Sequence, residues 1–263
     1  MILVFGGTTE GKKVATLLQE KSMPFVYSTK TNIPFQENKI ASYRHGALNE
    51  KQLESYLIKN DVKLIVNASH PFAEVLHNTI ARVAESLQIP VIRFGRKLLS
   101  KTINPLVSYV NTYDDACDLL EKHQVILALT GVQSIKRLKP WWQKQSIFFR
   151  ILNRPESLAI AAESNFPDEQ LILGLPSADL KKEIDLINTK SIDLILTKET
   201  GNSGFLSTKI NAALKTNTQI IIITQPEIPQ YFKLVFNETE LENLITEIKN
   251  SISLTNNTTV KWD

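Results

Sequence analysis

The chain has 263 residues, 43% of them hydrophobic, and a formal net charge of +3. That length suits one large or two modest globular domains, and so small a charge excess argues against a nucleic-acid partner. Neither a bilayer-spanning apolar run nor a signal peptide is visible, so we expect no membrane association. The single cysteine, Cys117, is expected to be a buried small hydrophobe, and a cytoplasmic protein fits these features best.

Short β-branched runs alternate with amphipathic stretches along the first part of the chain. We expect strands at residues 2–5, 25–28, 39–43, 64–67 and 91–93, and helices at 10–21, 50–59 and 74–87. Such alternation predicts a parallel, doubly wound sheet with right-handed crossovers. Residues 95–105 are basic and lack a clear period, so we place a domain junction there and assign residues 1–97 to an N-terminal domain.

The first expected strand runs into a glycine turn, residues 6–13. A P-loop needs a hydroxyl where Lys13 stands, and the strict dinucleotide pattern needs glycine where Thr8 stands. Small residues between a strand and a helix N-terminus still favour a phosphate, which backbone amides and the helix dipole attract. A plain turn with Thr9 as the helix N-cap is the alternative. We predict a cofactor phosphate site at Gly6, Gly7, Thr8 and Thr9.

The second expected strand ends in Ser28-Thr29-Lys30-Thr31. An NAD site usually has Asp or Glu there, whereas a lysine with hydroxyls suits the extra phosphate of NADP. An ordinary solvated loop is nearly as good an interpretation. If a dinucleotide binds here, NADPH is favoured, with Ser28 and Lys30 among its contacts. No tyrosine is followed by lysine four residues later, which weakens a short-chain dehydrogenase interpretation.

The fourth expected strand ends in the segment 67–73, which contains Ser69, His70 and Pro71. Ligands of open parallel sheets bind at the carboxyl edge, and this cluster is an unusual composition for a plain connection. The segment therefore predicts a ligand site.

Alternation resumes after the junction. We expect strands at residues 108–110, 125–129, 147–151, 171–173, 194–197 and 219–224, and helices at 113–122, 155–164, 179–188, 208–215 and 238–251. Residues 98–252 are assigned to a C-terminal α/β domain and residues 253–263, rich in Asn and Thr, to a flexible tail. The fold prediction is α/β, with two Rossmann-like doubly wound parallel-sheet domains and a cleft between them.

Further candidate ligand residues follow strands. Thr130-Gly131 ends one strand, and Lys198 leads from another into a loop that includes Ser203 and Gly204. A simple turn and a surface ion pair of Lys198 with Glu199 are the alternatives. Arginines also lie at or just past strand ends, and jointly they suit the carboxylates of a polyanionic substrate, although each alone is more often a surface residue: Arg93, Arg96, Arg150 and Arg154. No His/Cys cluster predicts a metal site.

Taken in order, these segments resemble the precorrin-6A reductase family of corrin biosynthesis, called cobalt-precorrin-6A reductase in the anaerobic route. The resemblance covers residues 2–226 and rests on the glycine turn, the run 68–73, the strand-end arginines, Thr130-Gly131 and the region 197–213. The chain departs from the family pattern at four positions: Asn67 in place of Asp, Val132 in place of a polar residue, Asn153 in place of Pro, and Gln225 in place of Arg.

The resemblance implies NADPH-dependent reduction of one ring double bond, from (cobalt-)precorrin-6A to the 6B product. It implies that Ser69 and His70 line the reaction zone, with His70 a candidate proton donor because imidazole titrates near neutrality. A role of His70 in capping the next helix is the alternative. The implied substrate is a tetrapyrrole-derived polycarboxylate, contacted by Arg93, Arg96, Thr130, Gly131, Arg150, Lys198, Ser203 and Gly204. Neighbouring corrin-pathway enzymes are possible partners, and a non-enzymatic NADP-binding or sensor protein is the second hypothesis.

Overall fold

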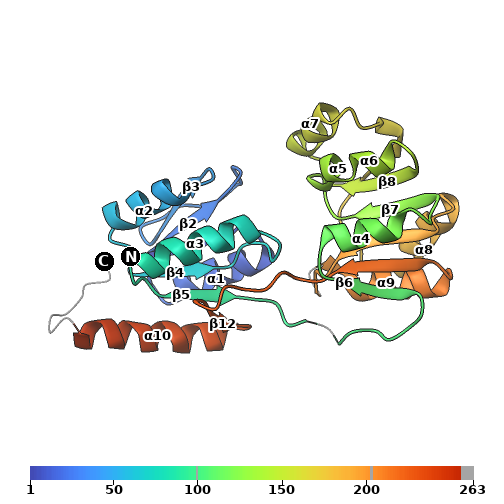
Figure 1. Cartoon of the computed structure of the whole chain (residues 1–263). Coiled ribbons are helices and arrows are strands. Elements are labelled where there is room, and N and C mark those ends of the chain that lie inside the picture. Colours follow the sequence, from blue (N-terminus) through green and yellow to red (C-terminus); the bar gives the residue numbers. More distant parts are fainter. Residues whose placement is uncertain (99, 202–203, 256–263) are drawn as a thin grey trace. The chain divides into compact units, whose positions relative to one another are not determined.

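The computed structural model describes residues 1–98, 100–201 and 204–255. The chain forms two compact units, residues 1–97 together with the segment from Pro226 onward, and residues 98–225. Each unit contains a six-stranded parallel sheet flanked by helices, so the expected α/β class is confirmed (Figure 1). No helix within the described ranges is both long and apolar enough to cross a membrane.

The sheet of the first unit has the strand order β12-β5-β4-β1-β2-β3. Its strands are β1 (Ile2–Phe5), β2 (Phe25–Thr29), β3 (Ala41–His45), β4 (Leu64–Asn67), β5 (Val91–Phe94) and β12 (Lys233–Val235). Its helices are α1 (Thr9–Glu20), α2 (Glu50–Lys59), α3 (Glu74–Ser86) and α10 (Glu238–Thr255). The chain turns back between β1 and β4, which makes that pair of strands the topological switch point.

The end of the chain belongs to the first unit, which corrects the expected assignment of residues 98–252 to one domain. β12 pairs in parallel with β5, and the Gly95 N–H donates to the Val235 carbonyl at 2.8 Å. α10 then packs beside α1 against the same sheet. Helix α10 extends to Thr255, and the rest of the expected flexible tail lies outside the described residues.

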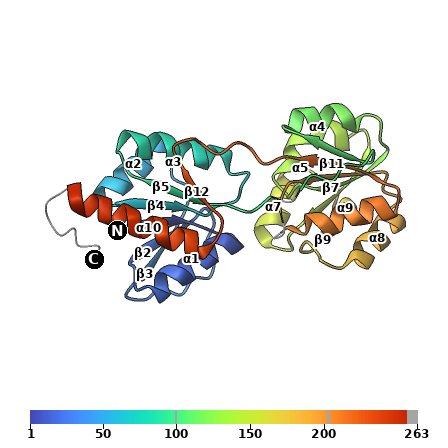
Figure 2. The same cartoon turned by 90° about the horizontal axis from the view of Figure 1, so that it is seen from below.

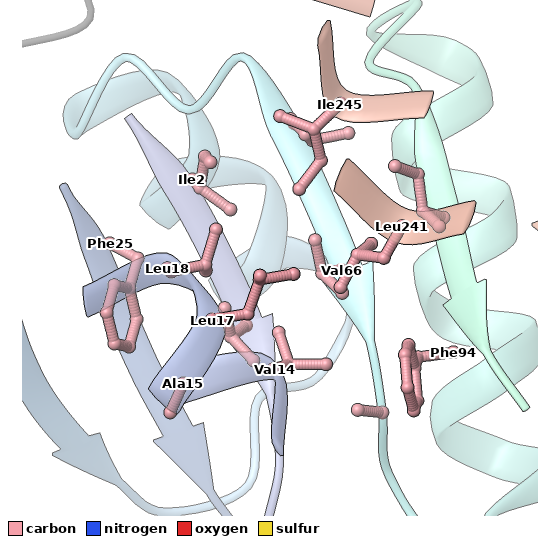
Figure 3. Packing of buried hydrophobic residues seen from close by; sticks show 14 of the residues in the cluster. Ile2, Val14, Ala15, Leu17, Leu18, Phe25, Val66, Phe94, Leu241 and Ile245 are labelled. Atoms are coloured by element: carbon pink, nitrogen blue, oxygen red, sulfur yellow. The ribbon is translucent and has the colours of Figure 1, made fainter. Parts of the chain in front are cut away.

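Two layers of apolar side chains hold the helices of the first unit to its sheet. One face packs against α1 and α10, where Val14, Leu18, Leu241 and Ile245 cover Val66 (Figure 3). Figure 2 views the sheet from the side of α10. The other face, which includes Leu3, Phe5 and Ile65, packs against α2 and α3. Strands buried on both faces explain the continuous apolar runs of the sequence.

The sheet of the second unit has the order β6-β11-β10-β7-β8-β9, with its switch point between β7 and β10. Its strands are β6 (Val107–Val110), β7 (Val125–Leu129), β8 (Ser146–Ile151), β9 (Leu171–Leu173), β10 (Leu194–Lys198) and β11 (Gln219–Ile223). Its helices are α4 (Tyr113–Leu120), α5 (Ser134–Arg137), α6 (Lys139–Trp142), α7 (Pro155–Glu163), the 3₁₀ turn η1 (Asp168–Gln170), α8 (Leu180–Thr189) and α9 (Leu206–Lys215).

Cys117 lies on the buried side of α4, as expected, and its burial raises the pKa of the thiol to about 11. The thiol therefore stays protonated and packs as an apolar group.

Candidate active site

The glycine turn and the Ser69–Pro71 loop both leave the carboxyl edge of the first sheet at its switch point. Phe5, the last residue of β1, is in register with Asn67 of β4 and with Ser28 of β2. The same row extends to Arg93 of β5 and to Arg44 of β3. Five neighbouring strands thus bring four polar side chains to the edge where open α/β sheets bind ligands.

The glycines of the first turn enclose the hydroxyl of Tyr27. A Cβ added at Gly6 would lie 2.2 Å from the Tyr27 ring, and one added at Gly11 would lie 2.7 Å from its hydroxyl oxygen. The Gly7 N–H donates to that oxygen at 2.9 Å, and Gly7 has a φ of +89°. Glycine is required here because a left-handed backbone and a buried aromatic ring leave no room for side chains.

Thr8 is the N-cap of α1, and not Thr9, which the plain-turn alternative had in that position. Its Oγ1 accepts from the Gly11 N–H at 2.9 Å and donates to the Ala68 carbonyl at 2.7 Å. The Thr8 hydroxyl therefore ties the glycine turn to the loop after β4, and its proton is already used. Thr9 and Gly7 remain exposed at the positive end of the helix, where a phosphate would meet backbone and hydroxyl donors.

Arg96 forms an ion pair with Glu10, in the first turn of α1. The Arg96 Nη2 donates to Glu10 Oε2 at 2.7 Å, and each side chain is only 11% exposed. This buried pair links the segment after β5 to the glycine turn.

Arg93 lies inside the first unit, with 2% of its surface exposed. Its Nη1 donates to the carbonyls of Asn67 and Ser69, at 3.0 and 2.9 Å, and to Asn67 Oδ1 at 3.1 Å. Burial lowers the pKa of Arg93 to about 10, which leaves it cationic at neutral pH. The sequence predicts a substrate contact at Arg93, whereas in the structure its guanidinium holds the backbone of the Ser69–Pro71 loop.

Asn67 is fully buried, and its amide orientation follows from its neighbours. Arginine can only donate, so the atom facing Arg93 is the oxygen Oδ1, which also accepts from the Ser69 N–H and from Ser69 Oγ, the latter at 2.7 Å. The amide nitrogen Nδ2 then faces His77 Nδ1 at 2.9 Å. Both the oxygen and the nitrogen of the Asn67 amide have hydrogen-bond partners, so the departure from Asp leaves neither atom orphaned.

The same constraint assigns the proton of His77. Its Nδ1 accepts from Asn67, and its Nε2 donates to the Pro71 carbonyl at 3.1 Å, so the ring is neutral with the proton on Nε2. Burial, with the nearby charge of Arg93, lowers the pKa of His77 to about 4, in agreement with a neutral ring. The carbonyls of residues 67, 69 and 71 are thus all held by buried side chains.

The hydrogen bonds that Ser69 and His70 already make determine whether each can donate to a ligand or accept from it. The Ser69 hydroxyl donates its proton to Asn67 Oδ1, so it can only accept a hydrogen bond from a ligand. His70 is exposed, and its Nδ1 accepts from the Phe72 N–H at 3.2 Å. A neutral His70 therefore carries its proton on Nε2. The contact with the Phe72 N–H fits the alternative interpretation, in which His70 orders the loop before α3.

The end of β2 is more ordered than a solvated loop. Ser28 is buried and its Oγ accepts from Nη1 of Arg44, on β3. Lys30 is exposed immediately after the strand. A carboxylate for ribose hydroxyls, which an NAD site usually provides at this strand end, is replaced by a serine–arginine pair and a lysine.

The second switch point is built around a tyrosine. The Tyr113 hydroxyl hydrogen-bonds to Thr130 and Ser134, and burial raises its pKa to about 12. Lys198 Nζ lies 5.3 Å from the centre of its ring and Arg137 Cζ 4.6 Å, which are cation–π distances. Gly131 is exposed with a φ of +86°, and nothing lies within 4 Å of a Cβ added there. This edge combines open backbone with Lys198 and with Arg137, whose Nη2 donates to Asp114 Oδ1 at 2.8 Å.

The other residues expected in the second unit differ in position. Gly204 is buried against Thr200, where a Cβ would lie 2.0 Å from the threonine Oγ1, and Ser203 lies outside the described residues. Arg150 donates both Nη atoms to the Glu183 carboxylate, at 2.8 and 2.9 Å, and its side chain is 10% exposed. Its bidentate clamp therefore already holds a carboxylate of the protein itself.

Sequence reasoning did not single out Tyr27, Arg44, His77, Tyr113 or Arg137. Tyr27 and Arg44 reach their sites from neighbouring strands through the strand register, whereas His77, Tyr113 and Arg137 lie on the helices α3, α4 and α5. The pairing of two strand ends in a parallel sheet was the one signal that could have pointed to Arg44.

Three comparisons with known proteins agree. The profile of the precorrin-6x reductase CbiJ/CobK family matches residues 1–248. Cobalt-precorrin-6A reductase of Methanocaldococcus jannaschii is 26% identical over 95% of this chain and 98% of its own length, and that of Methanococcus maripaludis is 28% identical over 86% and 92%. A solved structure described as CobK precorrin-6A reductase has the same fold, with a TM-score of 0.78 at 19% identity over 94% of this chain and 96% of that one.

Membership of this family fixes the reaction class. A reductase of this kind needs a reduced nicotinamide cofactor, and its substrate is a corrin-precursor macrocycle of the B12 pathway. The family profile matches nearly the whole chain, and the Methanocaldococcus jannaschii relative aligns over 98% of its own length. The chain therefore belongs to the precorrin-6x reductase family of cobalamin biosynthesis and is an oxidoreductase.

Proposed function

We propose that the protein reduces one ring double bond of (cobalt-)precorrin-6A to the corresponding 6B compound, with NADPH as the hydride donor. The observation that carries the proposal is the meeting of the glycine turn and the Ser69–Pro71 loop at one switch point, joined by the Thr8–Ala68 hydrogen bond. NADPH, when bound, supplies a hydride for one carbon of the macrocycle. A proton is delivered to the adjacent carbon, and NADP⁺ leaves.

The first unit fits a dinucleotide. The exposed backbone of Gly7, the Thr9 hydroxyl and the N-terminus of α1 would hold the pyrophosphate. Gly6 contributes by allowing the turn to close over Tyr27. Ser28 and Lys30 lie at the strand end that receives the adenosine ribose in such folds. The nicotinamide end then falls toward β4, beside Ser69 and His70.

His70 is the proposed proton donor and Ser69 a ligand-positioning group. The imidazolium form of His70 would deliver the proton, and the neutral ring that remains is stabilised by the Phe72 N–H, which donates to Nδ1. Ser69 Oγ can accept from a ligand amide, because its own proton goes to Asn67. Arg93 and His77 hold the loop carbonyls, so both groups start from one fixed geometry.

The second unit is proposed to bind the carboxylates of the macrocycle. Lys198 supplies positive charge beside Tyr113, and Thr130 and Gly131 offer a turn with open backbone, whereas Arg137 already pairs with Asp114. Arg93, Arg96 and Arg150 act in this proposal as internal supports, since each already holds a group of the protein.

A spectral titration tests the function. The purified protein is mixed with NADPH and either precorrin-6A or cobalt-precorrin-6A, and the loss of the NADPH absorbance is followed together with the corrin bands. Oxidation that requires a macrocycle supports the proposal, and the preferred macrocycle shows whether cobalt is already inserted. NADPH binding without turnover on either macrocycle would favour the second hypothesis, a non-enzymatic NADP-binding or sensor protein.

A variant pair then assigns His70. His70→Gln keeps a side chain that can accept from the Phe72 N–H but removes the acidic proton, so kcat is expected to fall while KM for NADPH changes little. His123→Gln, in the second unit, is the matched control and is expected to keep the wild-type kcat. Equal kcat values for the wild type and His70→Gln would remove His70 as the donor.

A further inference from the structure

Arg44 lies where the ribose of a dinucleotide would be recognised, although no motif marks it. It is the fourth residue of β3 and is in register with Ser28 of β2, which is in register with Phe5 at the end of β1. In doubly wound folds the phosphate turn follows the first strand, and the ribose hydroxyls fall at the end of the second. Arg44 therefore borders that ribose position from the neighbouring strand.

The guanidinium of Arg44 is held entirely by neutral groups. Nη1 donates to Ser28 Oγ, and Nη2 donates to the carbonyls of His45 and Gly46 at 3.1 and 2.8 Å. The Tyr56 ring lies 5.6 Å from Cζ and covers one side of it. No carboxylate pairs with Arg44 within the described ranges, so a fixed cation with spare N–H donors remains beside the strand end.

A second cation adjoins it through the backbone. The Gly46 N–H donates to the carbonyls of Thr29 and Lys30, at 3.0 and 3.2 Å, while the Gly46 carbonyl accepts from Arg44. Gly46 therefore joins the segment that carries the exposed Lys30 to the guanidinium of Arg44. No ion pair with a carboxylate holds Arg44 or Lys30 within the part of the chain that the structure describes. Two such cations disfavour the hydroxyl pair of an unmodified ribose, which needs acceptors, and suit a dianionic phosphate monoester.

We propose that Arg44 is the residue that selects NADPH over NADH, by donating to the 2′-phosphate of the adenosine ribose. Ser28 positions the guanidinium through its Oγ, and Lys30 adds charge from the other side of Gly46. This inference rests on the proposed function, because it assumes that the pyrophosphate lies on the glycine turn.

The test measures binding without catalysis and without the macrocycle. Isothermal titration calorimetry of the full chain compares 2′-phospho-ADP-ribose with ADP-ribose, for the wild type and for Arg44→Met. We expect the wild type to bind 2′-phospho-ADP-ribose more tightly than ADP-ribose. Arg44→Met should bind 2′-phospho-ADP-ribose about 10- to 100-fold more weakly than the wild type does, because charge-assisted hydrogen bonds are lost. The dissociation constant for ADP-ribose is expected to change far less.

Matched variants separate recognition from folding. Arg82→Met removes an exposed arginine that pairs with Glu50 on the α2–α3 side of the same unit and is expected to keep the wild-type preference. Arg44→Lys retains the charge but not the planar donor geometry, and an intermediate preference is expected. Ser28→Ala is expected to reduce the preference less than Arg44→Met does.

The outcomes are distinguishable from failure of the proposed function. A wild type that binds neither ligand contradicts dinucleotide binding at the glycine turn and the inference with it. A wild type that binds both ligands equally overturns the role of Arg44 and leaves a reductase of relaxed cofactor use. A folded Arg44→Met or Arg44→Lys protein that keeps the full wild-type preference overturns the inference alone and leaves Lys30 as the phosphate contact.

Discussion

At the residue scale, Gly6 and Tyr27 are expected to be energetically coupled. Gly6→Ala would place a Cβ 2.2 Å from the Tyr27 ring, and moving that ring is expected to cost about 1–3 kcal/mol of unfolding free energy. In a Tyr27→Leu background the obstacle is absent, so the same substitution should cost much less. Urea unfolding of the single and double variants measures the coupling, and additive effects would contradict the proposed packing.

His77 predicts an acid-side loss of stability. Its pKa is lowered to about 4 in the folded protein from an ordinary value of 6.5, so below pH 6.5 the unfolded chain takes up a proton that the folded chain does not. The contribution of neutral His77 to the unfolding free energy is therefore fully present above pH 6.5. It is lost as the pH falls toward 4, by about 3 kcal/mol in total. Urea unfolding at a series of pH values measures this decline.

The variant His77→Gln isolates that contribution. Between pH 6.5 and 4 it should show a smaller slope of unfolding free energy against pH than the wild type. His45→Gln removes an exposed histidine from the same unit and should keep the wild-type slope. Identical slopes for the wild type and His77→Gln would contradict a neutral, buried His77.

The site could be predicted from the sequence where chemistry and motif share one segment. Ser69 and the glycine turn lie at the switch point because both directly follow buried strands, which the apolar runs reveal. The donor or acceptor state of each group could not be predicted, because it depends on side chains from other elements. Asn67 was interpreted as a departure, yet His77 and Arg93 supply matching partners that are 10 and 26 residues away in the chain.

At the element scale, a buried charge cluster joins β8, α8 and α9. Arg150 and Glu183 form a bidentate pair, and Lys209 lies beside them, 4% exposed, with its Nζ donating to Thr197 Oγ1 at 3.3 Å. Burial and the charge of Arg150 lower the pKa of Lys209 to about 8, while Glu183 opposes that change. The single carboxylate of this cluster thus balances two cations.

Glu183→Gln is therefore expected to destabilise the protein strongly. It leaves two buried cations without a counter-charge, at a cost of about 3–5 kcal/mol. Unfolding free energies should show partial recovery in Glu183→Gln/Lys209→Met, which removes one of the cations. Glu156→Gln, at an exposed carboxylate of α7, is the control and should change stability by less than about 0.5 kcal/mol. A loss for Glu183→Gln as small as that of the control would contradict a desolvated cluster.

The elements that the sequence did not predict are short or interrupted. α5 and α6 span four residues each, and Pro140 with two tryptophans hides the helical period. β3 was expected at residues 39–43 but spans Ala41–His45, and this shift of two residues placed Arg44 outside the expected strand. β12 has three residues at a sheet edge, two of them exposed, so it lacks the apolar run that reveals buried strands.

At the scale of the whole molecule, the second unit is an insertion within the first. The chain leaves the first unit at Lys97 and returns at Pro226 to add β12 and α10. At both crossings one strand follows another with no helix between them, β5 then β6 and β11 then β12. The sequence marked only the first crossing, so periodicity alone could not tell where the last helix packs. Leu241 and Ile245 pack into the core of the first sheet, so the last helix belongs to the first unit (Figure 3).

This insertion predicts how fragments of the chain behave. Residues 98–225 contain a complete six-stranded sheet and are expected to unfold cooperatively on their own. Residues 1–97 lack β12 and α10, which leaves the apolar face around Val66, Ile92 and Phe94 uncovered, so this fragment should aggregate or remain partly folded. Joining residue 97 to residue 226 through a flexible linker of about 12 residues, with an average span of about 20 Å, should restore cooperative unfolding. Circular dichroism during urea unfolding distinguishes these cases. If residues 1–97 alone unfolded cooperatively at the same urea midpoint as the linked fragment, β12 and α10 would be dispensable. The apolar face around Val66 would then need no cover from the end of the chain.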